Sequence, residues 1–136
     1  MAKIVLGQRP ESFKKTVEIP LLDGSTSDVT LTFMYRSRTQ YAELIDKHND
    51  AARARHKNEG DTRPQDGEDK VFRLEKFVGL NNDADADLIL KIADGWDLED
   101  EFDKANVKRL IDDFGGASTK IVETYRIAIN EGRLGN

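Results

Sequence analysis

Apolar and polar residues alternate along residues 14–36, which is the pattern of β-strands. The apolar positions of the two halves are Val17, Ile19 and Leu21, then Val29, Leu31, Phe33 and Tyr35. A period of two places each apolar set on one face of a strand. Asp23-Gly24-Ser25 supplies turn residues between the halves. The pattern predicts a β-hairpin, with Pro20 on an edge strand or at a bulge because proline lacks a donor N–H.

Beyond residue 36 the apolar spacing changes to that of helices. Tyr41, Leu44, Ile45, His48 and Ala52 form one helical stripe. Ser37 or Thr39 is the expected N-cap, and we expect the helix to end near Arg55 or His56. Residues 57–69 hold no aliphatic or aromatic residue and contain two glycines and a proline. They predict a mobile loop.

Four further apolar groups predict the remaining helices. A short helix with Val71, Leu74, Phe77 and Val78 is expected to end at Gly79, and the next to run from Asn82 or Asp83 to Gly95. Asp83, Asp85 and Asp87 then lie in or near a first helical turn, where the helix dipole favours carboxylates. Asp103 is the expected cap of a helix that ends at Gly115-Gly116, and Ser118 or Thr119 that of a last helix ending before Gly132.

These elements predict an α+β fold in a single domain over residues 1–136. A β-hairpin comes first and four to five mostly C-terminal α-helices follow. A lone hairpin is only marginally stable in water, so we expect it to pack on the helices or to pair with another chain. Self-association into a homo-oligomer through the hairpin edge is therefore an open alternative.

Composition narrows the class of protein. The chain has no cysteine, which excludes disulfides and thiolate chemistry. No apolar run approaches the roughly 20 residues of a membrane span, so we expect a soluble intracellular protein with no membrane partner. The net charge of -5 is uneven, because residues 83–103 carry nine acids and only Lys91 as a base. Such a block repels phosphate backbones, so we expect no nucleic acid there.

The N-terminal part leaves a weaker alternative open. Residues 1–38 carry six basic and four acidic side chains, and two aromatic residues lie near the basic ones. Aromatic residues among cations are typical of nucleic-acid binding. The basic residues concerned are Arg9, Lys14, Lys15, Arg36 and Arg38, near Phe13 and Tyr35.

Catalytic and metal-binding patterns are missing. Counted from Asp83, an EF-hand loop requires glycine at its sixth position, where the chain has Leu88. His48 and His56 lie eight residues apart, whereas a helical metal pair uses three or four. No serine lies in a nucleophile-elbow motif and no phosphate-binding loop is present. We expect no enzymatic activity, no catalytic or metal-binding residue and no cofactor.

The only tryptophan stands in the acidic segment 95–103. Trp96 can be a buried cap of the preceding helix, or it can anchor a partner, since tryptophan is enriched at interface centres. Leu98 and Phe102 would extend such an anchor. Both interpretations stay open.

With these residues in view, the chain resembles the tail assembly chaperones of tailed bacteriophages. Residues 4–10 with Phe13-Lys14 are similar to their N-terminal start. Gly95-Trp96-Asp97-Leu98 and Tyr125-Arg126, followed by Ala128, Ile129 and residues 131–136, are similar to their C-terminal hallmarks. Such a chaperone is not an enzyme, so no catalytic residue is carried over.

The resemblance implies a function and partners. Proteins of this kind bind the tape measure protein, keep it soluble and help to recruit tail tube subunits in the host bacterial cytoplasm, and they are absent from the mature virion. We expect the helix faces around Trp96, Leu98, Phe102 and Tyr125 to contact partners. The alternatives are a phage or prophage regulator that binds nucleic acid through the N-terminal basic residues, and a minor structural tail protein.

Overall fold

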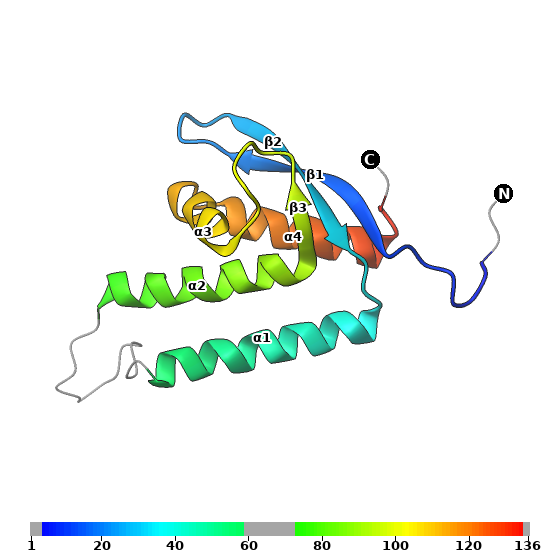
Figure 1. Ribbon diagram of the computed structural model, residues 1–136, viewed down its shortest axis with the longest axis horizontal. Helices are drawn as coiled ribbons and strands as arrows, with labels where there is room; N and C mark the ends of the chain where they lie inside the picture. The colour runs from blue at the N-terminus through cyan, green and yellow to red at the C-terminus, as the bar shows by residue number, and fades with distance from the viewer. Residues whose placement is uncertain (1–3, 59–72, 135–136) are drawn as a thin grey trace.

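The computed structural model describes residues 4–58 and 73–134, which form three strands and four helices (Figure 1). The elements in order are β1 (Ser12–Pro20), β2 (Thr26–Met34), α1 (Arg38–Asn58), α2 (Leu74–Ile92), β3 (Ala93–Trp96), α3 (Lys104–Asp113) and α4 (Ala117–Glu131). The predicted α+β fold, with an N-terminal hairpin and four mostly C-terminal helices, is confirmed.

The β1–β2 hairpin is the predicted one. The strands pair antiparallel in a register that sets Phe13 opposite Phe33 and Val17 opposite Val29. In the turn, Gly24 has a φ of 89°, a conformation that glycine adopts without strain. The Ser25 backbone N–H donates to the Asp23 carboxylate at 3.0 Å. Pro20 ends β1, which is an edge strand of the described sheet.

The strand β3 was not predicted from the sequence. It pairs antiparallel with β2, with Trp96 opposite Leu31 and an irregularity between Thr32 and Phe33. Gly95, expected to stop a helix, lies inside this strand. Four residues carry too little alternation to reveal a strand, and only the neighbouring β2 makes the segment extended.

The two helices expected between Val71 and Gly95 are one continuous helix, α2, within the described residues, and Val71 lies outside those residues. Gly79 lies within α2, and Asn82 and Asp83 are interior residues rather than caps. Glycine costs a helix interior only about 1 kcal/mol, which packing against α1 and α3 offsets. The predicted dipole role of Asp83, Asp85 and Asp87 is therefore wrong, because they lie in the middle of the helix.

The other helix ends follow local rules with one exception. Ser37 and Gln40 bond reciprocally at the start of α1, and the Asp103 carboxylate accepts the Asn106 N–H at 2.9 Å at the start of α3. α4 begins at Ala117 without a side-chain cap, so the predicted cap by Ser118 or Thr119 is wrong. α1 continues to Asn58, and residues 59–69 of the predicted mobile loop lie outside the described residues.

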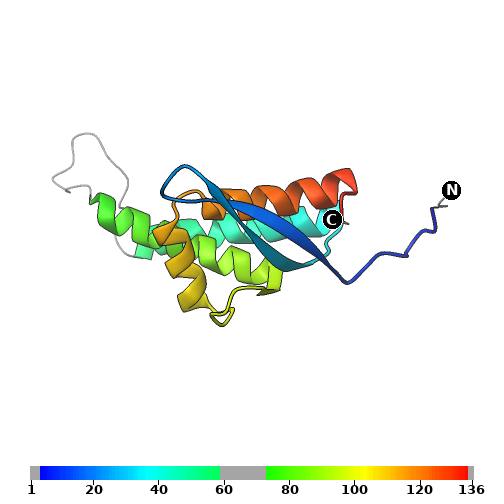
Figure 2. The same cartoon turned by 90° about the horizontal axis from the view of Figure 1, so that it is seen from above.

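The helices cover one face of the sheet, as Figures 1 and 2 show. α4 packs against β1, α2 packs against α4, and α1 lies on the outer side of α2. Tyr125 of α4 is the largest fully buried side chain. Its ring lies 5.3 Å from that of Phe33 and 6.1 Å from that of Tyr41, centroid to centroid. These aromatic contacts join the sheet, α4 and α1.

Ion pairs join α1, α2 and α3 away from this core. The Asp83 carboxylate lies 3.0 Å from Arg55 Nε and 3.0 Å from Lys104 Nζ, and Asp87 pairs with the same two cations. The hydrogen bond from Lys104 lowers the pKa of Asp83 and raises the pKa of Lys104. The mid-helix aspartates thus bind neighbouring helices. Among the described residues, no helix is long and apolar enough to span a bilayer.

Candidate functional site

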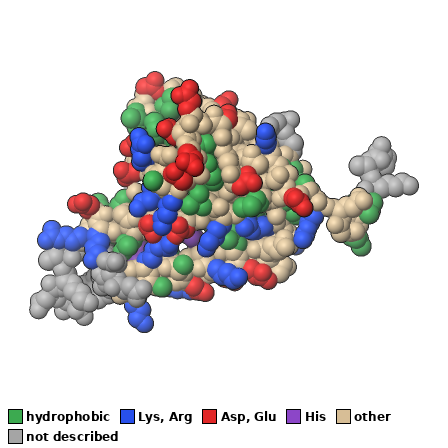
Figure 3. All heavy atoms as spheres, in the orientation of Figure 1, with side chains coloured by type: hydrophobic (Ala, Val, Ile, Leu, Met, Phe, Trp, Pro, Cys, Tyr) green, Lys and Arg blue, Asp and Glu red, His purple; other side chains and the backbone are tan. Residues whose placement is uncertain are grey.

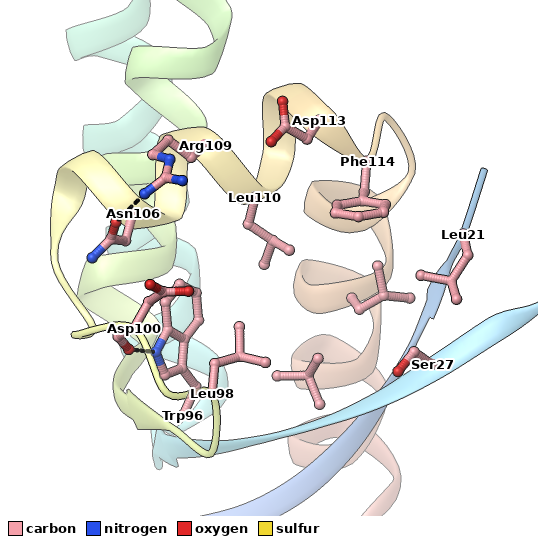
Figure 4. A pocket seen from close by; sticks show the side chains of 12 residues that line it. Leu21, Ser27, Trp96, Leu98, Asp100, Asn106, Arg109, Leu110, Asp113 and Phe114 are labelled. Carbon is pink, nitrogen blue, oxygen red and sulfur yellow. Dashed lines mark hydrogen bonds between the residues drawn. The ribbon is translucent and has the colours of Figure 1, made fainter.

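A groove of about 260 Å³ opens between the turn end of the hairpin and α3 (Figure 4). Its lining is mainly apolar and comes from three parts of the chain. The hairpin contributes Ile19, Leu21 and Val29, β3 and the following loop contribute Trp96 and Leu98, and α3 with its C-cap contributes Leu110 and Phe114. The groove therefore offers an apolar surface to a partner.

Polar side chains edge the groove. Asp100 and Asp113 are carboxylates, and Arg109 and Asn106 lie between them on the α3 side. The Arg109 guanidinium donates to the Asn106 side-chain oxygen at 3.2 Å. In Figure 3, acidic side chains surround hydrophobic patches in the upper part of the molecule, whereas Lys and Arg are more numerous below. The charge near the groove favours a partner that carries cations.

The loop 97–103, called here the acidic loop, has a fixed shape. The Trp96 indole N–H donates to the Asp100 carbonyl at 2.7 Å. The Trp96 ring packs edge-on against the Phe102 ring, with 5.1 Å between the ring centroids. Asp97 binds Thr30 of β2 twice, through its backbone N–H and through its carboxylate, at 3.0 Å each. A wall that is already ordered loses little entropy when a partner binds.

The apolar stripe of α3 divides between core and groove. Val107 and Ile111 are buried, whereas Leu110 and Phe114 are half-buried and turn toward the groove. The stripe is therefore wider than packing against α2 alone requires. Leu110, Phe114 and Leu21 were missed as groove residues, because periodicity does not separate core positions from groove positions.

Three of the four predicted contact residues come together here. Trp96 and Leu98 line the groove, and Phe102 supports the Trp96 ring. None of the three is fully buried, so the buried-cap interpretation of Trp96 holds only in part.

Tyr125 lies elsewhere, inside the core, with no exposed surface. Its hydroxyl donates to the Met34 carbonyl at 2.8 Å and accepts from the Arg36 guanidinium at 3.3 Å. Burial raises the pKa of its phenol. Tyr125 has no surface to offer a partner, so its predicted contact role is corrected to a core role.

Arg36 and Arg9, from the N-terminal basic group, are engaged within the chain. The Arg36 guanidinium also donates to the Lys91 carbonyl in the last turn of α2, at 2.7 Å. The Arg9 guanidinium lies over the Tyr35 ring, 5.9 Å from its centroid. The basic residues therefore do not form one free patch.

Three side chains of types that often act in catalysis, Asp85, His48 and Ser118, lie between helices. Asp85, of α2, interacts with both His48 of α1 and Ser118 of α4, and the Ser118 hydroxyl donates to the Asp85 carboxylate. Burial raises the pKa of Asp85 and lowers the pKa of His48. Within residues 4–58 and 73–134, no three acidic, histidine or cysteine side chains are placed to hold a metal ion.

The structure thus shows a small α+β protein with an apolar groove that carries carboxylates at its edge. The model of the phage tail assembly chaperone family matches residues 1–136, so the chain belongs to that family, and the predicted resemblance is confirmed. No curated protein and no solved structure matches significantly. Membership supports a role as a chaperone in the assembly of phage tails.

Proposed function

We propose that this chaperone binds the tape measure protein through the groove, keeps it soluble and helps to recruit tail tube subunits to it. The work takes place in the host bacterial cytoplasm, and the chaperone leaves before the virion is complete. Family membership supports a chaperone role, and the groove is the observation that carries the choice of surface.

The groove has the features of a helix-binding surface. An amphipathic helix binds through a few apolar side chains that enter a groove, while its polar face stays in water. The apolar lining, with Leu98 and Leu110 between Trp96 on one side and Phe114 on the other, can receive such anchors (Figure 4). Asp100 and Asp113 at the edge favour lysine or arginine beside the anchors. The net charge of -5 helps to keep the complex in solution.

Co-expression with the tape measure protein tests the proposal. Leu98→Asp places a charge in the apolar lining, so we expect the amount of soluble, co-purified tape measure protein to fall about tenfold or more, the scale of an interface hot spot. Leu74→Asp is the matched control, because Leu74 is 63% exposed at the start of α2 and away from the groove. Circular dichroism establishes that both variants fold.

Two further measurements complete the test. Trp96→Ala should weaken capture as well. If both groove variants fold and capture the tape measure protein fully, the groove is not the binding surface.

Purified tube protein added to the captured complex should be retained, and mass spectrometry of finished particles should find no chaperone. A stoichiometric amount in the particles would instead support the structural-protein alternative.

A further inference from the structure

Arg109 brings a positive charge into a groove whose other charged lining residues are carboxylates. The charged residues of the described lining are Asp100, Arg109 and Asp113, and all three are exposed. Figure 4 shows Arg109 between the two carboxylates, on the α3 side of the groove. The charges along this edge therefore follow each other in the order negative, positive, negative.

The Arg109 guanidinium has a defined place but no ion pair. Arg109 and Asp113 lie one helical turn apart on α3, a spacing at which arginine and aspartate can pair. Within the described part of the chain, the guanidinium instead donates to the Asn106 side-chain oxygen at 3.2 Å. The Asn106 amide in turn donates to the Glu101 carbonyl at 2.8 Å, so this acceptor is itself held in place. Arg109 keeps most of its five N–H groups for a partner.

Two arginines of α1 show how the fold uses such side chains elsewhere. Arg55 pairs with Asp83 and Asp87 of α2, and Arg53 pairs with Asp50 on the same helix. Arg109 has carboxylates on its own edge of the groove and leaves them unpaired. Its charge therefore does not serve to join the described helices, and it lies where a partner would meet it.

A positive charge at this place changes what the groove accepts. An edge with carboxylates alone would bind any cationic amphipathic helix, because each lysine of that helix would meet a favourable charge. A lysine opposite Arg109 is repelled instead, whereas a carboxylate there can accept two N–H groups of the guanidinium at once. Discrimination between partners depends on such repulsion of the wrong one as well as on attraction of the right one.

We propose that Arg109 selects the segment of the tape measure protein that enters the groove, by requiring a carboxylate beside its apolar anchors. The segment is an amphipathic helix with an aspartate or glutamate opposite Arg109. On either side of that acid it carries a lysine or arginine, opposite Asp100 and Asp113. The inference rests on the proposed function and deepens it, because it gives the chemistry of the bound segment.

Two synthetic helical peptides test this selection without tape measure protein. Both carry leucine anchors on one face and a lysine near each end. They differ only at the central position beside the anchors, which is glutamate in one peptide and lysine in the other. Because Trp96 lines the groove and is the only tryptophan, the change in its emission during titration measures the affinity of each peptide.

The wild-type chain should bind the glutamate peptide about five- to tenfold more tightly at low salt, since one exposed contact changes from repulsion to attraction. The preference should shrink in high salt. The net charge of -5 by itself favours the lysine peptide, so a preference for glutamate has to come from a local cation.

Substitution of Arg109 should remove the preference. Arg109→Glu should reverse it in favour of the lysine peptide, and Arg109→Gln should abolish the preference for glutamate. Arg53→Glu is the matched control, because it changes the net charge as much as Arg109→Glu does but lies on the exposed side of α1. It should keep the wild-type preference. In co-expression, Arg109→Glu should lower the captured tape measure protein about fivefold, and Arg53→Glu should not.

Several outcomes would overturn the inference. They are equal affinities of the wild-type chain for the two peptides, tighter binding of the lysine peptide, no binding of either peptide, and a preference for glutamate that survives in folded Arg109→Glu. None of them contradicts the proposed function, whose test is the capture of tape measure protein by Leu98→Asp. If Leu98→Asp captures that protein fully while the peptide preference holds, the proposed function fails and Arg109 selects a different partner.

Discussion

The two ends of the molecule each contain a large aromatic residue, and they use it in opposite ways. At one end Tyr125 is enclosed by Phe13, Phe33 and Tyr41, and its hydroxyl is satisfied by Met34 and Arg36. At the groove end Trp96 is half-buried, and its N–H is satisfied by the backbone of the acidic loop. The end around Tyr125, called here the closed end, is shielded from solvent, whereas the groove end is open to solvent.

The forces at the two ends differ as well. The closed end is held by buried aromatic contacts between β1, β2, α1 and α4. The α3 wall of the groove is joined to α2 partly through charges, since Lys104 and Lys108 reach Asp83. Burial of apolar side chains stabilises a domain more than surface charges do. Residues in the α3 wall of the groove can therefore be substituted with little loss of stability. This difference supports our proposal that partners bind at the groove end.

Removing the two aromatic side chains should give the largest contrast. Tyr125→Ala should destabilise the protein by about 3–5 kcal/mol, because it leaves a cavity in the aromatic core. Trp96→Ala should cost clearly less, about 1–2 kcal/mol, because the ring is already partly in water. Urea denaturation measures both. Equal losses would mean that the two ends do not differ in packing.

Ionisation of the Tyr125 phenol, at the closed end, should destabilise the protein at alkaline pH. Its folded-state pKa is raised above the ordinary 10.0 by burial. The neutral phenol is therefore favoured by folding, and its contribution to stability is present below pH 10 and lost as the pH rises through the folded pKa. Tyr125→Phe should reduce the loss of stability above about pH 10, although it lowers stability at pH 7 by about 1–2 kcal/mol. An unchanged alkaline transition would contradict this.

The smallest expected change in stability comes from the ion pairs of Asp83 at the groove end. Asp83→Asn should cost about 0.5–1 kcal/mol, since water screens these half-exposed pairs, and the cost should shrink in high salt. The pKa of Asp83 is lowered, so its contribution is present above pH 3.8 and is lost as the pH falls through the folded value. Hydrogen exchange should quicken in α3 but not around Tyr125.

Asp50→Asn is the matched control for that variant. Asp50 pairs with Arg53 on the exposed side of α1, with both side chains about 70% exposed, so its removal should change neither stability nor exchange in α3. If Asp50→Asn and Asp83→Asn behave alike, the ion pairs of Asp83 do not hold α3 in place.

Local sequence rules predicted much of the fold. The alternation of Val17 and Ile19, the Asp23-Gly24-Ser25 turn and the Asp103 cap each depend on residues close in the chain, and each is confirmed. The continuity of α2 through Gly79 and the strand β3 were missed. Both depend on partners distant in sequence, because α2 as a whole packs against α1 and α3, and β2 holds β3 extended.

The candidate site shows the same division. The sequence by itself determined that the chain is acidic and free of recognisable catalytic patterns, and that Trp96 and Tyr125 are large aromatic residues on helical or acidic segments. Only the tertiary structure decided that Tyr125 is enclosed and that Trp96, Leu98 and Leu110 meet at a groove. Periodicity identifies which face of a segment is apolar, but exposure depends on whether another element covers that face. That choice is made by long-range packing.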